Sequence, residues 1–320
     1  MATLLLTRSE VERLVDPAAL VADLSAAFRA YSTTPGLRAQ RVRSSLNDRG
    51  SATVLFPGTV AGIPAYTVKV HAKFPDQRPA IRGVLCLHDA HTGDLLAVMD
   101  STHLTAVRTG LAGALAADVL ARAGAETVAV VGAGMQGEHQ LRSLAMLRPL
   151  SRVWAYDTRP EQAQAFAARM AAELRIAVEP SASLEVAVRE ADIILAATWA
   201  RTPFLFLPML RQGVHVTTLG ADEPGKCEVA AEVMREAVVV CDDRDLAVRM
   251  GAVGGAGLGP EVIDAELGEV LAGVHPGRTS PSEMTVFGGV GLAFQDLVVA
   301  WEVYRLASTR RAGRAMDFLA

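Results

Sequence analysis

Cysteine is scarce in this sequence, in which only Cys86, Cys227 and Cys241 occur among 320 residues. Three scattered cysteines without a C-x-x-C pair offer neither a disulfide framework nor the ligand spacing of a structural zinc site. We therefore interpret them as ordinary small buried side chains.

Clustered metal ligands are also missing. His71, His88, His91 and His103 are close in sequence, but they fall on separate predicted strands, a turn and a helix. Metal binding needs convergent ligands with supporting hydrogen bonds, so surface or hydrogen-bonding roles are the simpler interpretation. We predict no metal site.

Strong net charge and long apolar runs are absent too. The formal net charge is -4, which gives no basic footprint for nucleic acid. No uninterrupted apolar run is long enough to span a bilayer. The first residues, with Glu10, Glu12 and Asp16 soon after a short leucine run, lack the layout of a signal peptide. We expect a cytoplasmic protein that binds neither nucleic acid nor membranes.

What the chain does contain is a buried strand that runs into a glycine-rich turn and then a helix. The β-branched run Val128–Val131 is typical of a parallel strand, and Gly132, Gly134 and Gly137 after it form G-x-G-x-x-G. In a dinucleotide-binding turn these glycines allow a tight bend, close backbone approach to a pyrophosphate, and helix packing on the strand. The following helix offers unpaired N–H groups to the phosphates.

A second strand, 152–157, follows at the spacing of a βαβ unit. Asp157 ends it about 20 residues after the last glycine, where a carboxylate binds the ribose hydroxyls of NAD and repels a 2′-phosphate. The alternative is that Asp157 caps the helix that starts near Pro160. Arg159 keeps NADP possible. We predict NAD as the cofactor.

Length and pattern predict two domains. With 51% hydrophobic residues the chain can bury a substantial core. A helix over 16–31 and short strand-like runs at 52–56, 65–70, 83–87 and 95–99 predict a small, mostly antiparallel sheet. From residue 126 strands alternate with helices, which indicates a Rossmann-type doubly wound parallel sheet. We therefore predict an α/β protein with a smaller α+β domain over 1–112, completed by a C-terminal helix over 291–320, and a Rossmann domain over 113–290.

Several cations suit a substrate carboxylate. Lys69 lies in an apolar strand, where a buried charge is costly unless a counter-charge meets it. Arg108 lies beside the apolar stripe of a helix, and Arg41 and Arg43 precede the first strand. An arginine can clamp a carboxylate through two hydrogen bonds. The alternative is that Lys69 extends its ammonium to water and Arg108 pairs with a structural acid.

A carboxylate follows a predicted parallel strand in Gly220-Ala-Asp222-Glu-Pro-Gly-Lys226. The carboxyl end of such a strand faces the cofactor, so Asp222 is a candidate acid/base. The alternative is a turn-forming aspartate before Pro-Gly.

Together these motifs resemble the ornithine cyclodeaminase and mu-crystallin family over nearly the whole chain. The resemblance is carried by the segments 66–69, 91–93, 104–109, 132–137, 220–228, 268–273 and 285–291. Arg108-Thr and the Gly-x-Asp-x-Pro-Gly-Lys element are fairly specific to that family, whereas the glycine fingerprint is not.

The resemblance implies a homodimer that pairs through the small domain, which would also bind substrate. It implies that Arg41, Lys69 and Arg108 bind an amino acid carboxylate and that Asp222, with Lys69, is catalytic. Arg43 stays an alternative to Arg41. The cofactor-binding residues predicted from the fingerprint and the resemblance together are Gly132, Gly134, Met135, Gln136, Gly137, Asp157, Thr198, Leu219 and Lys226.

Two departures from the family pattern bear on the reaction. Val54 stands where family members that cyclise ornithine resemble one another in having a glutamate for the side-chain amine, so an ornithine ammonium there would lack its counter-charge. Gly288-Gly289 stands where the family often has a serine, which widens the expected pocket.

We therefore predict an NAD(P)-dependent amino acid dehydrogenase, or an imine (ketimine) reductase, that acts on a small or apolar L-amino acid or its 2-oxo or imino acid. A cyclodeaminase that converts ornithine to proline and ammonia is one alternative. A cofactor-dependent small-molecule binding protein, as the mu-crystallin resemblance allows, is another. The joint presence of Lys69, Arg108 and Asp222 argues against the binding protein, because storage needs none of them.

Overall fold

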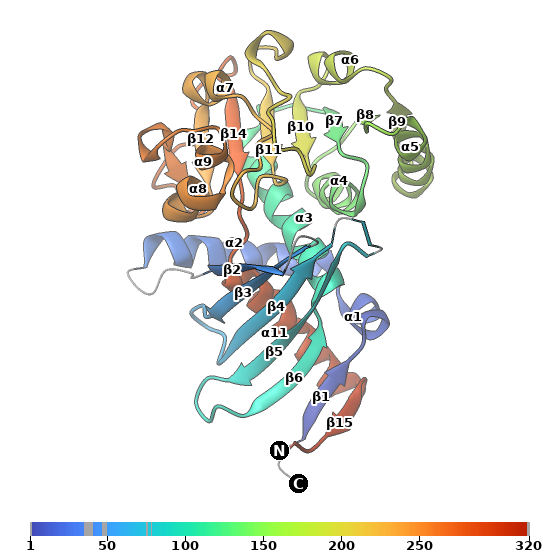
Figure 1. The fold of residues 1–320 in the computed structure, drawn as a ribbon, viewed down its shortest axis with the longest axis vertical. Helices are drawn as coiled ribbons and strands as arrows, with labels where there is room; N and C mark the ends of the chain where they lie inside the picture. The colour runs from blue at the N-terminus through green and yellow to red at the C-terminus, as the bar shows by residue number, and fades with distance from the viewer. Residues whose placement is uncertain (1, 35–40, 47–49, 75, 78, 319–320) are drawn as a thin grey trace. The chain divides into compact units, whose positions relative to one another are not determined.

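The computed structural model describes residues 2–34, 41–46, 50–74, 76, 77 and 79–318 (Figure 1). The chain folds into two compact units, one made of Met1–Arg108 with Leu292–Ala320 and the other of Thr109–Gly291. Helix α3 (Ser101–Leu120) begins in the first unit and ends in the second.

The first unit is a seven-stranded sheet with helices on one face. The strand order is β15-β1-β6-β5-β4-β3-β2, and every neighbouring pair is antiparallel except β1 and β6. Helix α11 packs on β3 and β4 and against α2. The elements are β1 (Thr3–Leu6), α1 (Arg8–Leu14), α2 (Pro17–Thr33), β2 (Arg41–Leu46), β3 (Gly50–Gly58), β4 (Ala65–Lys73), β5 (Ile81–Asp89), β6 (Leu95–Asp100), α11 (Ala293–Arg310) and β15 (Arg314–Met316).

The two faces of this sheet differ in burial. Along β4 the residues 65, 67, 69, 71 and 73 are buried, whereas Val70 is exposed. This alternation follows from the period of two in a strand, with one face under α11 and the other open. A strand that buries one face can therefore carry two separate chemical surfaces.

The second unit is an eight-stranded sheet in which all pairs are parallel, in the order β13-β12-β14-β11-β10-β7-β8-β9. From β7 the sheet extends to one side through β8 and β9 and to the other side through β10 and β11, as in a doubly wound sheet. Its strands are β7 (Thr127–Val131), β8 (Arg152–Tyr156), β9 (Ala177–Pro180), β10 (Ile193–Ala196), β11 (His215–Thr218), β12 (Val238–Cys241), β13 (Ala265–Glu266) and β14 (Thr285–Gly288). Its remaining helices are α4 (Met135–Leu147), α5 (Pro160–Leu174), α6 (Leu184–Arg189), α7 (Ala231–Glu236), α8 (Arg244–Met250), α9 (Ala252–Gly255) and α10 (Leu267–Leu271).

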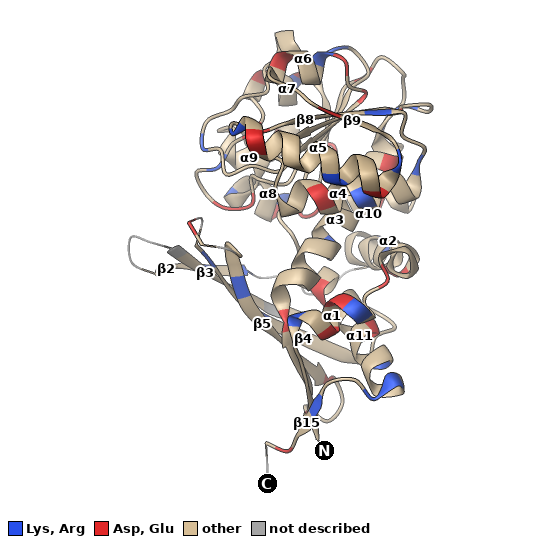
Figure 2. Ribbon diagram, turned by 90° about the vertical axis from the view of Figure 1, so that its right-hand side faces the viewer, with Lys and Arg blue, Asp and Glu red and all other residues tan. Residues whose placement is uncertain are grey.

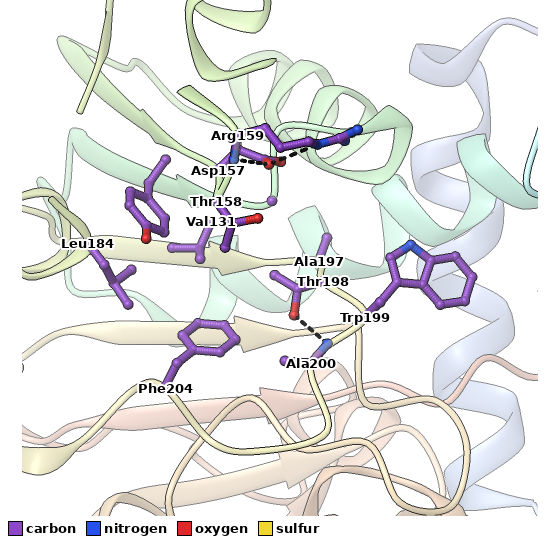
Figure 3. Close-up of a pocket in the computed structure, with 13 residues that line it drawn as sticks. Val131, Asp157, Thr158, Arg159, Leu184, Ala197, Thr198, Trp199, Ala200 and Phe204 are labelled. Carbon is purple, nitrogen blue, oxygen red and sulfur yellow. Dashed lines mark hydrogen bonds and ion pairs between the residues drawn. The ribbon is translucent and has the colours of Figure 1, made fainter. Parts of the chain in front are cut away.

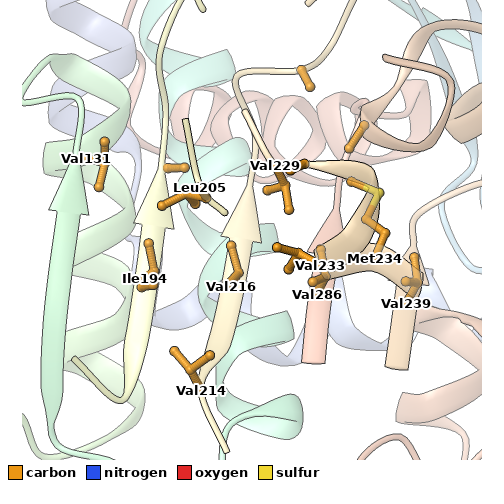
Figure 4. Packing of buried hydrophobic residues seen from close by; sticks show 14 of the residues in the cluster. Val131, Ile194, Leu205, Val214, Val216, Val229, Val233, Met234, Val239 and Val286 are labelled. Atoms are coloured by element: carbon orange, nitrogen blue, oxygen red, sulfur yellow. The ribbon is translucent and has the colours of Figure 1, made fainter. Parts of the chain in front are cut away.

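The core of the second unit is aliphatic. Ile194, Val216 and Val286 from three adjacent strands are fully buried and face Leu205 and Val233 (Figure 4). A second cluster on the other face includes Phe166 and Met170 of α5. Charged residues of both signs lie on the outer helices, such as α4 and α5 (Figure 2). A parallel sheet buried on both faces is what such continuous apolar strands predict.

These observations confirm the predicted fold class. Five strands were not predicted: β1, β2, β13, β14 and β15. The expectation that Arg41 and Arg43 precede the first strand was wrong, because both lie within β2. Among the described residues, no helix combines the length and the apolar character needed to cross a membrane.

Candidate active site

The glycine-rich turn joins β7 to α4 as predicted. Gly132 has φ +98°, and a Cβ there would lie 2.5 Å from the carbonyl oxygen of Ala197. A Cβ at Gly137 would lie 2.4 Å from the carbonyl oxygen of Gly132. At Gly134, the N-cap of α4, a Cβ would meet nothing within 4 Å. Gly132 and Gly137 are therefore required by packing, whereas Gly134 borders open space.

A cavity of about 450 Å³ opens in front of this turn (Figure 3). It brings together four of the predicted cofactor residues, Gly132, Gly134, Asp157 and Thr198. Its other lining residues are Val131, Tyr156, Thr158, Arg159, Leu184, Ala197, Trp199, Ala200 and Phe204.

Asp157 is already engaged in the turn. Its Oδ2 accepts a hydrogen bond of 3.1 Å from the backbone N–H of Ala133, and its Oδ1 accepts one of 3.0 Å from the N–H of Arg159. Nε of Arg159 lies 3.7 Å from the same Oδ1. The carboxylate is thus fixed at the end of β8 and lines the cavity without being the N-cap of α5, which is Arg159.

The other predicted cofactor residues do not line the cavity within the described part of the chain. Met135 and Gln136 open α4, with Met135 39% exposed and Oε1 of Gln136 buried without a hydrogen-bond partner among the described residues. Leu219 follows β11 directly. Lys226 is 4% exposed and lies with Nζ 4.2 Å from the ring centroid of Trp199, which does line the cavity.

Glu228 connects the cavity to the segment that carries Asp222. Its Oε1 accepts hydrogen bonds of 2.7 Å from both the N–H and the hydroxyl of Thr198. Its Oε2 accepts from the hydroxyl of Thr218 at 2.7 Å and from the N–H of Gly220 at 2.9 Å. Burial raises the pKa of Glu228, while these four donors lower it. The sequence analysis did not identify this residue.

Asp222 lies two residues after Gly220 and forms an ion pair. Its Oδ1 is 2.9 Å from Nζ of Lys226, whose Nζ is also 3.5 Å from Oε1 of Glu223. The Asp222 side chain is 23% exposed, so the carboxylate stays accessible while its partner is buried. An accessible carboxylate at the end of a parallel strand suits a proton acceptor.

The residues around this cavity fit a dinucleotide. The backbone at Gly134 is open for close approach by a pyrophosphate, and the N-terminus of α4 favours negative charge. The fixed carboxylate of Asp157 suits paired ribose hydroxyls.

The first unit contains a buried polar cluster in which Lys69 is the central cation. Nζ of Lys69 donates hydrogen bonds of 2.7 Å to Oδ1 of Asp296 and 3.2 Å to Oγ1 of Thr105. Arg108 donates from Nε to the same Oδ1 at 3.2 Å and from Nη1 to Oε1 of Gln295 at 3.0 Å. Lys69, Asp296 and Gln295 are each exposed by 1% or less.

Charge and burial act against each other at Lys69. Burial lowers the pKa of Lys69, the carboxylate of Asp296 raises it, and Arg108 and Arg41 lower it, with a net pKa of about 7. Arg41 belongs to this face because β2 and β3 pair it with Leu55, which pairs with Lys69 on β4. Arg43, on the same strand, is exposed. The structure therefore brings Arg41, Lys69 and Arg108 to one polar region.

Asp296 and Gln295 were missed in the sequence. They are adjacent polar residues among the buried apolar residues of α11. Polar residues on an apolar helix face are unusual, and this could have identified them in the sequence. A buried carboxylate so placed needs cations, and the helix period alone does not reveal which ones.

Val54 requires a correction. It pairs with Val42 and Val70, and this row lies on the face opposite to Lys69. Within this chain a ligand at Lys69 therefore does not meet the Val54 side chain, and the sequence argument against ornithine loses its structural basis.

The comparisons with known proteins cover the whole of this architecture. Residues 1–310 match the profile of the family described as "Ornithine cyclodeaminase/mu-crystallin family". An alanine dehydrogenase of Archaeoglobus fulgidus is 33% identical over 99% of both chains. The structure of an archaeal alanine dehydrogenase dimer with bound NAD superposes with a TM-score of 0.92 at 31% identity, covering 100% of each chain. A Δ1-pyrroline-2-carboxylate reductase of Thermococcus litoralis, in complex with NADH and L-proline, gives 0.90 at 28% identity over 98% of this chain and 99% of that one.

Proposed function

Since the chain belongs to the ornithine cyclodeaminase/mu-crystallin family, we propose that it is an NAD(P)-dependent oxidoreductase that interconverts a small L-amino acid with its imino or 2-oxo acid. Alanine dehydrogenase and pyrroline-2-carboxylate reductase act on substrates of this kind, and both solved relatives carry a nicotinamide cofactor. The cytoplasmic location expected from the sequence stays a prediction.

One observation carries the substrate assignment. Lys69 and Arg108 share a single oxygen of the buried Asp296, so two cations meet one carboxylate. Asp296 balances only one of these two positive charges. A bound anion would balance the other and so offset the cost of burying it. The α-carboxylate of an amino acid has the charge and the geometry for this position, and Arg41 faces the same region.

We assign the cofactor as NAD on the position of Asp157. A carboxylate held in place by two backbone N–H groups accepts hydrogen bonds from ribose hydroxyls and repels a phosphate on the same ribose. Arg159, 54% exposed at its side chain, is the cation that would accommodate NADP. We expect Asp157→Ala to weaken NAD binding by about tenfold and to reduce the difference between the affinities for NAD and NADP. Quenching of tryptophan fluorescence measures both affinities. Glu161→Ala, which removes a neighbouring acidic residue, is the control.

Lys69, Arg108 and Asp222 have different roles in the proposed reaction. A nicotinamide bound in the cavity at Gly134 and Asp157 would supply the hydride acceptor or donor for the α-carbon. Lys69 and Arg108 hold the carboxylate, which fixes the orientation of the α-carbon. Asp222 accepts a proton from the amine or the attacking water and returns it in the reverse direction. The oxidative reaction converts L-amino acid, NAD⁺ and water to 2-oxo acid, ammonium, NADH and H⁺.

The proposal includes a homodimer that pairs through the open face of the first sheet. Val42, Val70 and Val84 are 50%, 45% and 48% exposed and, with Val54, form one row across four strands. A contiguous exposed apolar row marks an association surface, and a relative is a dimer. Val70→Lys should yield monomers in sedimentation velocity. Val186→Lys, at a 56% exposed position of α6, should leave the dimer intact.

The primary experiment follows absorbance of NADH while the purified protein is offered NAD and pools of L-amino acids, with ornithine kept separate. A rise with a pool of small amino acids supports the proposal. Ammonia and proline from ornithine without net change in NADH would instead indicate a cyclodeaminase. Tight NAD binding without turnover in either direction would indicate a binding protein.

A further inference from the structure

His71 is a buried histidine without a hydrogen bond. It is 4% exposed, and neither Nδ1 nor Nε2 has a partner among the described residues. Buried polar atoms in native proteins are nearly always paired, because an unpaired one loses its hydrogen bonds to water without replacement. The imidazole therefore has hydrogen-bonding capacity that the folded chain itself does not use.

The position of His71 indicates what would use that capacity. It follows Lys69 by two residues on β4, so both side chains lie on the buried face of the sheet. Oδ2 of Asp296, the residue whose Oδ1 accepts from Lys69, and the hydroxyl oxygen of Thr67, on the same face of β4, are likewise buried without partners among the described residues. Unpaired polar atoms therefore occur on both sides of Lys69 along this face, as in a region completed by a polar ligand.

The same cations that attract an anion keep His71 neutral. Burial, with a further contribution from Lys69, Lys73, Arg41 and Arg108, lowers its pKa to about 2. A neutral imidazole has one N–H donor, and it cannot deliver protons as a general acid near neutral pH. The imidazole of His71 is therefore suited to binding. A carboxylate held by the ammonium of Lys69 and the guanidinium of Arg108 can accept a further hydrogen bond, and the N–H of His71 can donate it.

We propose that His71 is a substrate-binding residue whose neutral imidazole donates a hydrogen bond to the substrate carboxylate at Lys69 and Arg108. The inference rests on the proposed function only for the identity of that carboxylate. It adds a neutral donor to a site that the sequence assigned to cations alone.

A matched pair of histidines separates this role from a structural one. His215 is also fully buried and neutral, but its ring nitrogens pair with hydroxyls of Thr285 and Thr217 at 2.9 Å. Replacing His71 by Phe removes unpaired atoms and should leave thermal stability unchanged or raise it. His215→Phe removes satisfied bonds and should lower thermal stability.

The test measures propionate binding to the full chain with saturating NAD, from the propionate-dependent rise in unfolding temperature. We expect His71→Phe to weaken propionate binding about tenfold, and His71→Gln, which keeps a donor, to stay within about threefold. His215→Phe should bind propionate as the unmodified protein does. In turnover, His71→Phe should raise KM with little change in kcat.

Equal propionate affinity in His71→Phe and the unmodified protein would overturn the inference, as would an equal loss in His215→Phe. Propionamide, which lacks the charge, should bind equally to both His71 forms. Because this binding assay needs no turnover, a protein that binds propionate through His71 but oxidises no amino acid would refute the proposed function alone. Turnover without any effect of His71 would refute the inference alone.

Discussion

Nζ of Lys69 lies 2.7 Å from Oδ1 of Asp296, although 227 positions separate the two residues in the sequence. Arg108 donates to the same oxygen, so one carboxylate holds both cations. The second oxygen, Oδ2, has no partner among the described residues. The position of the two cations that we propose as substrate-binding residues therefore depends on a residue of α11.

Asp296→Asn tests that dependence. We expect a loss of about 3 kcal/mol in stability, because two buried cations lose their counter-charge, and a fall of about 100-fold in kcat/KM, because their positions relax. Asp192→Asn is the control, since Asp192 is also buried and pairs with Arg122 and Arg211 in the second unit. It should lose comparable stability, measured by urea unfolding, without a change in propionate affinity. Equal loss of propionate affinity in both variants would contradict the assigned role.

Carboxylate binding should depend on pH through Lys69. The ammonium form binds the anion, and its pKa of about 7 means that this form is depleted above neutrality. Affinity should fall as pH rises through about 7, by up to about tenfold per pH unit. The fall should end at the higher pKa that Lys69 has when the anion is bound. Asp296 raises this pKa, so Asp296→Asn should move the fall to lower pH. Lys69→Arg should bind at constant affinity from pH 6 to 9. A flat profile for the unmodified protein would be inconsistent with this account.

Acid should destabilise the fold through two neutral histidines. The pKa of His71 is lowered to about 2 and that of His215 to about 3, mainly by burial. In the unfolded chain both take up protons near pH 6.5. Between these values the unfolded state binds more protons, so stability falls with decreasing pH by about 1.4 kcal/mol per pH unit for each histidine. Urea unfolding from pH 7.5 to 4.5 measures the slope, and His71→Phe should reduce it. An unchanged slope in that variant would mean that His71 is protonated in the folded state.

Substitutions of two glycines in the turn should distinguish an effect on stability from an effect on cofactor binding. Gly134→Ala has space for its Cβ and should fold with nearly unchanged stability, yet the methyl group occupies the approach to the backbone and should weaken NAD binding. Gly137→Ala places its Cβ against the carbonyl of Gly132 and should lose both stability and NAD binding. Calorimetric titration with NAD and thermal unfolding on both variants provide the comparison. Full NAD affinity in Gly134→Ala would show that the pyrophosphate lies elsewhere.

Local patterns were sufficient to predict much of this fold. The run at 128–131 could be recognised because a strand buried on both faces has no polar residues and here leads into glycine. Lys69 was identifiable because a charge within an apolar strand demands an explanation. Strand β2 was not predicted, because an edge strand with mostly exposed polar residues has no clear alternation.

Long-range pairing accounts for what the sequence did not reveal. Strand β1 pairs with β15 near the opposite end of the chain, and neither run is long enough to be identified alone. Glu228 and Asp296 were missed because their donors come from several separate segments, and only the folded chain brings these together.

The alternation along β4 limits how this strand can vary. Lys69 and His71 face inward, and Val70 between them faces outward. Single substitutions can alter one face and leave the other unchanged. An insertion or deletion of one residue exchanges the two faces, which places valine among the cations and lysine in the apolar row. Mutagenesis libraries that aim to change ligand preference in this strand should therefore hold its length constant.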